Sequence, residues 1–169
     1  MRLSVRWVFF LGFFLCALML AIAGYFQFVE DLEPCPLCIL SRVVVLAIGG
    51  IFLVAALHNP RSWGVKIYAL LGFVVTLIGI GVTGRHVWLQ NLPADQVPAC
   101  GPGLNFMLDN FPLTETLELV FRGSGECAEV QWSFLGLTIP GWTLAAFLLL
   151  GVISLWQMGR AGSGVEKLT

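Results

Sequence analysis

Charged side chains are scarce in this sequence of 169 residues: Asp, Glu, Lys and Arg make up 11% of it, while 58% of the residues are hydrophobic. A soluble domain has about 25% charged and roughly 45–50% apolar residues. The shortage of charge excludes an ordinary water-soluble domain and indicates a chain that resides in a lipid bilayer. We expect no nucleic-acid partner for such a chain.

The sequence also lacks the alternation of polar and apolar residues that a membrane β-barrel requires. Its apolar residues instead form four continuous runs, 8–28, 39–57, 67–89 and 142–158. Each run approaches or exceeds the roughly 17–25 helical residues that cross about 30 Å of hydrocarbon. The sequence therefore predicts an all-α integral membrane protein, with four transmembrane helices in a single membrane domain over residues 1–169.

Basic residues are concentrated on one side of the predicted helices. Six of the nine lie before the first helix, between the second and third, or after the fourth: Arg2, Arg6, Arg61, Lys66, Arg160 and Lys167. Nine of the ten acidic residues lie on the other side. Because Lys and Arg are retained in the cytoplasm, we expect both termini to be cytoplasmic, with outer loops at 29–38 and 90–141.

The longer outer loop is rich in proline and glycine, so much of it should be irregular. Within it, Leu113, Leu117, Val120 and Phe121 recur at helical spacing, and Thr114 could cap the start of a helix. The pattern predicts a short amphipathic helix. Its apolar stripe could lie in the membrane interface or pack on the ends of the transmembrane helices.

Small side chains share one face of the third predicted helix, at Gly72, Thr76, Gly79 and Thr83. Such residues let neighbouring helices approach closely in a membrane. We interpret this face as a packing surface without chemistry.

Cysteine is present at five positions that differ in their surroundings. Cys16 falls within the first predicted helix, where we interpret it as a small apolar packing residue. Cys35 and Cys38 stand just before the second helix, and Cys100 and Cys127 lie in the long outer loop. These last four are on the side of the membrane where disulfides persist, and they are the candidate catalytic residues.

The spacing of the four outer cysteines favours redox chemistry. Cys35 and Cys38 form a C-x-x-C motif, a recurrent redox arrangement whose short ring would restrain little chain as a simple staple. A disulfide between Cys100 and Cys127 could alternatively be structural and stabilise the loop by roughly 3–4 kcal/mol. The four cysteines do not have zinc-ribbon spacing, so we predict no metal site.

The residues near the C-x-x-C motif support a reactive thiolate. The second helix begins beside these cysteines, and the partial positive charge at a helix N-terminus stabilises a thiolate. Arg42, four residues after Cys38, adds a permanent positive charge on the same helical face, unless it extends to the lipid headgroups. His86, near the outer end of the third helix, could pass a proton or donate a hydrogen bond.

Two stretches carry a resemblance to a known family. These are PCPLCI at residues 34–39, followed by Arg42, and SGECAEVQWSFLGL at residues 124–137. With them, nearly the whole chain resembles the DsbB family, the quinone-linked disulfide-bond formation proteins of the bacterial inner membrane.

The resemblance implies a site and a reaction. The protein would reoxidise a soluble DsbA-like oxidase of the thioredoxin fold in the periplasm and pass the electrons to ubiquinone or menaquinone. A thiolate of that partner would attack Cys100, the released Cys127 would attack Cys35, and Cys38 would face the quinone. By similarity, Arg42 and His86 would lie at the quinone. The active cysteines would be on the periplasmic side.

Two other functions are compatible with parts of the pattern. A structural four-helix membrane protein with a disulfide-stapled outer loop would need no turnover. A quinone or epoxide reductase of the vitamin-K type would also pair a membrane C-x-x-C with a quinone, but we would expect that motif within the last helix. Arg85, beside His86, could tune the quinone or meet lipid headgroups, and the sequence leaves both open.

Overall fold

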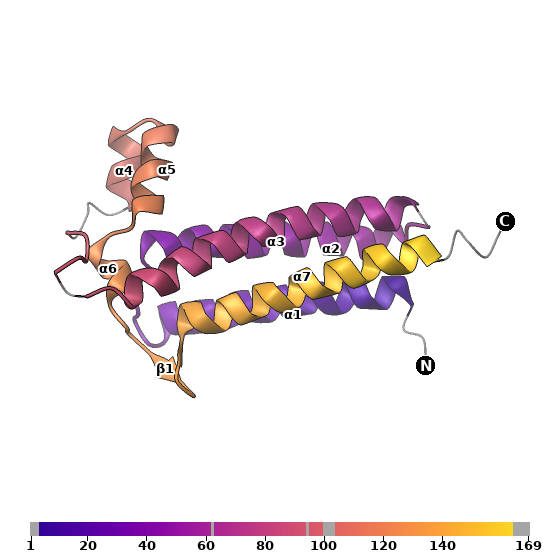
Figure 1. Ribbon diagram of the computed structural model, residues 1–169, viewed down its shortest axis with the longest axis horizontal. Coiled ribbons are helices and arrows are strands. Elements are labelled where there is room, and N and C mark those ends of the chain that lie inside the picture. Colours follow the sequence, from indigo (N-terminus) through magenta and orange to yellow (C-terminus); the bar gives the residue numbers. More distant parts are fainter. Residues whose placement is uncertain (1–3, 62, 94, 100–103, 164–169) are drawn as a thin grey trace.

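Four long helices dominate the computed structural model of the chain, which describes residues 4–61, 63–93, 95–99 and 104–163. They are α1 (Val5–Phe28), α2 (Pro36–His58), α3 (Trp63–Gln90) and α7 (Ile139–Ser163). The four lie side by side as a bundle (Figure 1), and each is long and apolar enough to cross a membrane. The predicted four-helix membrane protein is confirmed.

The bundle has two unlike ends. The start of α1 and the end of α7 lie together at one end, and the elements between α3 and α7 lie at the other (Figure 1). Within the bundle, α2 packs against both α1 and α3, and α3 packs against α7. Cys127, in α6 (Gly125–Ala128), therefore lies at the end of the bundle opposite the start of α1 and the end of α7. We call this end the outer end, because the sequence predicts that it lies on the non-cytoplasmic side.

The start of α2 is fixed by Pro36. Cys35 precedes it as the N-cap residue in an extended conformation (φ −65°, ψ 162°), and Pro36 is the first helical residue. Proline suits this position because its ring presets the helical φ and its missing N–H would be unpaired there anyway. The C-x-x-C motif therefore straddles the helix start, with Cys35 outside the first turn and Cys38 inside it.

Large aromatic rings fill the core where α3 has glycine. The rings of Phe52 and Phe147 are fully buried. A Cβ atom added at Gly72 would lie 2.7 Å from Phe52, and one added at Gly79 would lie 2.5 Å from Phe147. Both distances are too short for real contacts, so only glycine leaves room for these rings. The small-residue face of α3 is the packing surface that the sequence predicted.

Large apolar side chains cover the outside of the bundle. Leu18 on α1, Leu46 on α2, Leu77 on α3 and Val152 on α7 are all exposed. A water-soluble protein rarely exposes a continuous apolar surface of this extent. This apolar surface is compatible with a lipid bilayer, because the hydrocarbon core of the bilayer is itself apolar.

Three short helices and a small hairpin occupy the outer end. They are α4 (Leu104–Asn110), α5 (Leu113–Arg122), α6 (Gly125–Ala128), β1 (Ser133–Phe134) and β2 (Leu137–Thr138). The long loop is thus more regular than its proline and glycine content suggested. The predicted amphipathic helix is confirmed as α5, which stands with α4 at the outer end (Figure 1).

The structure corrects the predicted start of α5 and shows which of its apolar residues are buried. Its N-cap is Pro112, without a side-chain cap, so the predicted capping role of Thr114 is wrong. Val120 is buried among the tops of the helices, whereas Leu113 and Phe121 remain exposed. One side of α5 therefore packs on the protein, and an apolar row is left at its surface.

The strands β1 and β2 form an antiparallel hairpin that leads into α7. Ser133 pairs with Thr138 and Phe134 with Leu137. The turn residues Leu135 and Gly136 both have positive φ, 51° and 79°, as the tight two-residue hairpin turns require.

The last helix begins earlier than the sequence predicted, at Ile139 instead of residue 142. Pro140 and Gly141 suggested a loop, but proline is tolerated in the first turn of a helix. The end of the hairpin therefore passes directly into the fourth membrane helix.

Candidate redox site

Two of the predicted catalytic residues meet at the start of α2. The Cys35 thiol lies 3.2 Å from the Cys38 sulfur and donates to it. Cys35 is buried and Cys38 is partly buried. Because both sulfurs lie at the N-terminus of a long helix, the partial positive charge there favours the thiolate form.

A third cysteine reaches this pair from the long outer loop. Cys127 lies in α6 and is fully buried. Its sulfur, the Cys35 sulfur and a ring nitrogen of His86 all lie within 4.8 Å of one another. The fold thus brings together three of the four predicted cysteines, while the prediction for Cys100 lies outside the described residues.

His86 lies beside both thiols of the C-x-x-C motif. Its Nε2 is 3.7 Å from the Cys35 sulfur, and its Nδ1 is 4.0 Å from the Cys38 sulfur. The imidazole is buried near the outer end of α3. A neutral imidazole has one donor and one acceptor nitrogen, so this ring can accept a proton from one thiol while it donates to the other sulfur.

The thiols lie in an apolar environment. Cys35 and Cys127 belong to a buried cluster, which we call the outer cluster, with Leu37, Val82, Leu89, Met107 and Val120. The side chains of α4 and α5 help to close it. Burial limits the contact of the Cys35 and Cys127 sulfurs with water, while a small pocket of about 30 Å³ reaches Cys35 and Cys38 beside Glu126, Glu129 and Gln131.

The protonation of Cys127 depends on its neighbour. The hydrogen bond with Cys35 and the burial of the sulfur raise the pKa of the Cys127 thiol above its ordinary value. Ser124, whose hydroxyl is 3.8 Å from the same sulfur, is a further polar neighbour. With Cys35 reduced, Cys127 therefore stays a thiol at neutral pH and is a weak nucleophile.

Arg42 is turned into the protein and contacts α1. Its guanidinium donates one hydrogen bond to the side-chain oxygen of Gln27 and another, of 3.1 Å, to the backbone oxygen of Ala23. The side chain is partly buried. The arginine is thus held in place by two acceptors of α1, one turn from Cys38, and does not extend freely to the headgroups.

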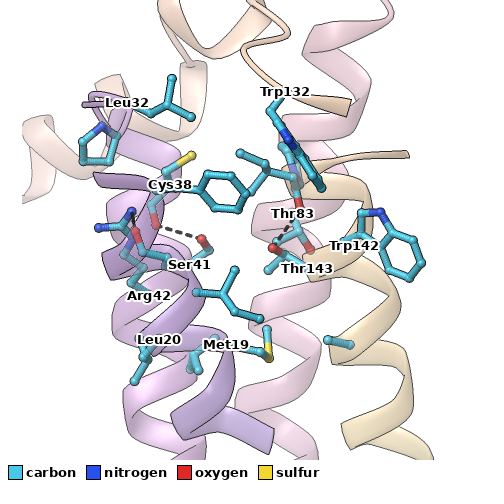
Figure 2. Close-up of a pocket in the computed structure, with 18 of the residues that line it drawn as sticks. Met19, Leu20, Leu32, Cys38, Ser41, Arg42, Thr83, Trp132, Trp142 and Thr143 are labelled. Carbon is cyan, nitrogen blue, oxygen red and sulfur yellow. Dashed lines mark hydrogen bonds between the residues drawn. The ribbon is translucent and has the colours of Figure 1, made fainter. Parts of the chain in front are cut away.

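A cavity of about 450 Å³ opens beside Cys38. Cys38, Ser41 and Arg42 face Thr83, Trp132 and Trp142 across it (Figure 2). Its walls also include Leu15, Leu18, Met19, Phe26, Val45, His86, Phe134, Ile139, Thr143 and Ala146. Its volume is typical of small-molecule sites, which have mostly apolar walls and a few polar groups.

The donor set at the thiols also bears on metal binding. Cys35, His86 and Cys127 offer three buried ligand atoms, and zinc binds such atoms in tetrahedral sites. Spacing in the sequence could not reveal this set, because His86 comes from another helix. A metal ion would occupy the sulfurs that disulfide exchange requires, so metal binding and exchange are alternatives at this cluster.

Arg85 and Cys16 do not line the cavity. Arg85 donates to the backbone oxygens of Phe121 and Arg122 at the end of α5. Cys16 is buried against Gly49, where an added Cβ would lie 3.2 Å from it. The packing role predicted for Cys16 agrees with this position.

The sequence analysis missed polar residues that organise the site. Gln27 accepts from Arg42. Gln90 accepts a 2.7 Å hydrogen bond from Thr138 and donates to the backbone oxygen of Glu129. An amide near the end of an apolar helix was the available signal for both glutamines, because a polar group in a membrane helix requires a partner.

The fold and the site together define a class: a four-helix membrane protein in which a loop cysteine meets a C-x-x-C pair beside a cavity between the helices. Residues 5–157 match the family described as Disulfide bond formation protein DsbB. The chain belongs to the DsbB family.

Relatives named Disulfide bond formation protein B are similar over nearly their whole length. The protein of Nitrosococcus oceani is 92% identical over 169 residues, which is 100% of both chains. That of Methylococcus capsulatus is 54% identical over 158 residues, 94% of this chain and 96% of the relative. That of Hahella chejuensis is 54% identical over 154 residues, 91% and 92% of the two chains.

Proposed function

We propose that this chain is a protein-dithiol:quinone oxidoreductase of the bacterial inner membrane. It reoxidises a DsbA-like thioredoxin-fold oxidase on the periplasmic side and passes two electrons to a membrane quinone, which supports disulfide formation in exported proteins. The observation that carries the proposal is the position of Cys127 and the C-x-x-C pair in one buried cluster beside a cavity of about 450 Å³.

The first exchange takes place in the outer loop. A thiolate of the partner attacks Cys100 of a Cys100–Cys127 disulfide, which forms a mixed disulfide and releases Cys127 as a thiolate. Cys127 then attacks Cys35 of a Cys35–Cys38 disulfide, which forms a Cys35–Cys127 bond and releases Cys38. Each step exchanges one S–S bond for another, as thiol–disulfide exchange requires.

The second exchange returns the outer pair to its oxidised state. The second thiolate of the partner attacks the mixed disulfide, so that the partner leaves with its own disulfide and Cys100 is released. Cys100 then attacks Cys127 and frees Cys35. The net result is one oxidised partner and a Cys35–Cys38 dithiol that holds two electrons and two protons.

His86 and Arg42 serve the thiol next to the cavity. His86 is close enough to both sulfurs of the pair to take the proton of one thiol while the Cys35–Cys38 bond forms again. Arg42, fixed by Gln27 and Ala23, holds a positive charge at the cavity wall where negative charge develops. Two inert disulfide staples would need neither group.

The cavity fits a quinone. Its walls are largely apolar, as an isoprenoid tail requires, and Cys38, Arg42 and His86 bring polar groups to one region of it that could hold the ring oxygens. When bound, ubiquinone or menaquinone supplies a two-electron, two-proton acceptor. The protein supplies proximity, a fixed positive charge and a proton acceptor.

Anaerobic mixing tests this function. The purified protein with its bound quinone is mixed with a reduced thioredoxin-fold oxidase while the quinone absorbance is followed. We expect wild-type protein to reduce the quinone and a Cys38→Ser variant to lose this activity. A Cys16→Ala variant, which removes a cysteine that does not line the cavity, is the control. No quinone reduction by wild-type protein, or a full rate in Cys38→Ser, would exclude the proposed path.

A further inference from the structure

Arg85 ties the end of α5 to α3. Its Nε donates to the backbone oxygen of Phe121 at 3.3 Å, and its Nη2 donates to that of Arg122 at 3.1 Å. Its guanidinium also lies 4.2 Å above the centre of the Trp88 ring. The last carbonyl groups of a helix have no partner within it and carry partial negative charge, so the guanidinium fork matches them in both geometry and charge.

The chain between this tie and Cys127 is short and constrained. Gly123 has a φ of 82°, and a Cβ atom there would collide with Leu89 of α3. Its N–H donates back to Leu119 and Val120, which closes the end of α5. Residues 124–126 alone separate Gly123 from Cys127. The Cys127 N–H donates to the backbone oxygen of Ser124 at 2.9 Å. The position of the α5 end therefore determines the position of the Cys127 sulfur.

A second tie holds the chain on the far side of Cys127. Gln90, near the end of the same helix, donates to the backbone oxygen of Glu129 at 3.5 Å and accepts from Thr138 at 2.7 Å. Helix α3 thus holds the segment that carries Cys127 both before and after this residue. The same helix carries His86, which lies next to the Cys35 sulfur.

We infer that Arg85 is a positioning residue for the transfer between Cys127 and Cys35, through its hold on the end of α5, and not a ligand of the quinone. This inference rests on the proposed relay. The composition of the cavity wall supports this inference, because the described lining residues include Arg42 and do not include Arg85. Loss of the Arg85 guanidinium should therefore slow electron entry from the loop and leave electron delivery from Cys38 intact.

The test compares two routes of electron entry in Arg85→Gln. In the first, a reduced thioredoxin-fold oxidase donates through the loop. In the second, Arg85→Gln is combined with Cys100→Ala and Cys127→Ala, and dithiothreitol reduces the Cys35–Cys38 pair directly. Hydrogen bonds to a charged group contribute about 1.5–3 kcal/mol, so we expect the first rate to fall about tenfold or more. The second rate should equal that of the double cysteine variant with Arg85 present.

Arg122→Gln is the matched control, because it removes the same charge at the same helix end. The Arg122 side chain makes only an exposed ion pair with Glu118 among the described contacts, so both rates should stay unchanged. Arg85→Lys keeps the charge but loses the planar guanidinium that donates to two oxygens at once. Its rate with the reduced oxidase should fall between those of wild type and Arg85→Gln.

The outcomes separate this inference from the proposed function. A wild-type protein that cannot reduce quinone with the oxidase would refute the relay itself. A working wild type with an unchanged loop-driven rate in Arg85→Gln would overturn the role of Arg85. Equal losses by both routes, in Arg85→Gln and Arg85→Lys alike, would overturn it too, because the defect would then lie at the C-x-x-C pair or in the fold.

Discussion

The sulfur atoms of Cys35 and Cys127 lie within 4.8 Å of each other, although two membrane helices and most of an outer loop separate them in the chain. A small displacement suffices to bring them to bonding distance. The Cys38 sulfur lies 3.2 Å from the Cys35 sulfur. In the proposed relay, Cys35 is therefore the sulfur through which the loop and the cavity exchange electrons, and the predictions below follow from that position.

Replacing His86 should slow the chemistry at both sulfurs of the C-x-x-C pair. Its ring nitrogens lie 3.7 and 4.0 Å from these sulfurs, and a positioned proton acceptor typically contributes about 100-fold or more to a rate. We expect His86→Asn to lower single-turnover quinone reduction by about that factor and to flatten its pH dependence near neutrality. His58→Gln, at the opposite end of the bundle, is the control. An unchanged pH profile in His86→Asn would remove the proton-transfer role.

Replacing Gln27 should weaken quinone binding without any change to the charge of the site. Gln27 accepts from the Arg42 guanidinium, and a hydrogen bond to a charged group contributes about 1.5–3 kcal/mol. We expect Gln27→Leu to raise the apparent KM for quinone about tenfold, with a smaller effect on the maximal rate. Titration with a short-chain quinone measures both quantities. If KM stays at the wild-type value, Arg42 does not depend on this contact.

The pH dependence of Cys127 alkylation should reveal its hydrogen bond with Cys35. Iodoacetamide reacts with the thiolate, and the pKa of Cys127 is raised. Alkylation of the reduced protein should therefore be slow at neutral pH and rise only at a pH above the ordinary range of a cysteine. Cys35→Ala should shift this rise to lower pH, whereas Cys38→Ala should not. Identical profiles in the two variants would show that burial alone protects Cys127.

Enlarging Gly79 should destabilise the bundle. An added Cβ would lie 2.5 Å from the Phe147 ring, and overpacking of a core typically costs about 1–3 kcal/mol. We expect Gly79→Ala to lower the midpoint of thermal unfolding in detergent. Gly81→Ala is the control on the same helix, because its Cβ would meet nothing within 4 Å. A midpoint for Gly79→Ala equal to that of Gly81→Ala would contradict the packing described.

Much of the fold was predictable because a membrane makes hydropathy decisive. Each run long enough to cross the bilayer became a helix, and the helical spacing of apolar residues located α5. The start of α7 was missed, because proline usually indicates a loop. In the structure the preceding hairpin leads directly into α7, and Pro140 lies in the first turn of that helix. The β1–β2 hairpin depends on positive φ at Leu135 and Gly136, and Leu135 gives no sign of this in the sequence.

The residues that meet at the candidate site could be named from the sequence where a motif or the family resemblance included them, as for the C-x-x-C pair, Cys127, Arg42 and His86. The partners of these residues were not. Arg42 meets Gln27, and Arg85 meets the end of α5, through contacts between distant parts of the chain. Such contacts depend on how helices pack, and a single sequence gives no direct signal of them.

The most direct test of the account is the formation of a disulfide between Cys35 and Cys127. In a Cys38→Ala/Cys100→Ala double variant, mild oxidation should link these two sulfurs within one chain, as intact mass and peptide mapping would show, and Cys16 should stay reduced. If Cys35 and Cys127 both remain open to alkylation, or form links only between separate chains, electrons cannot pass from the loop to the membrane pair as described.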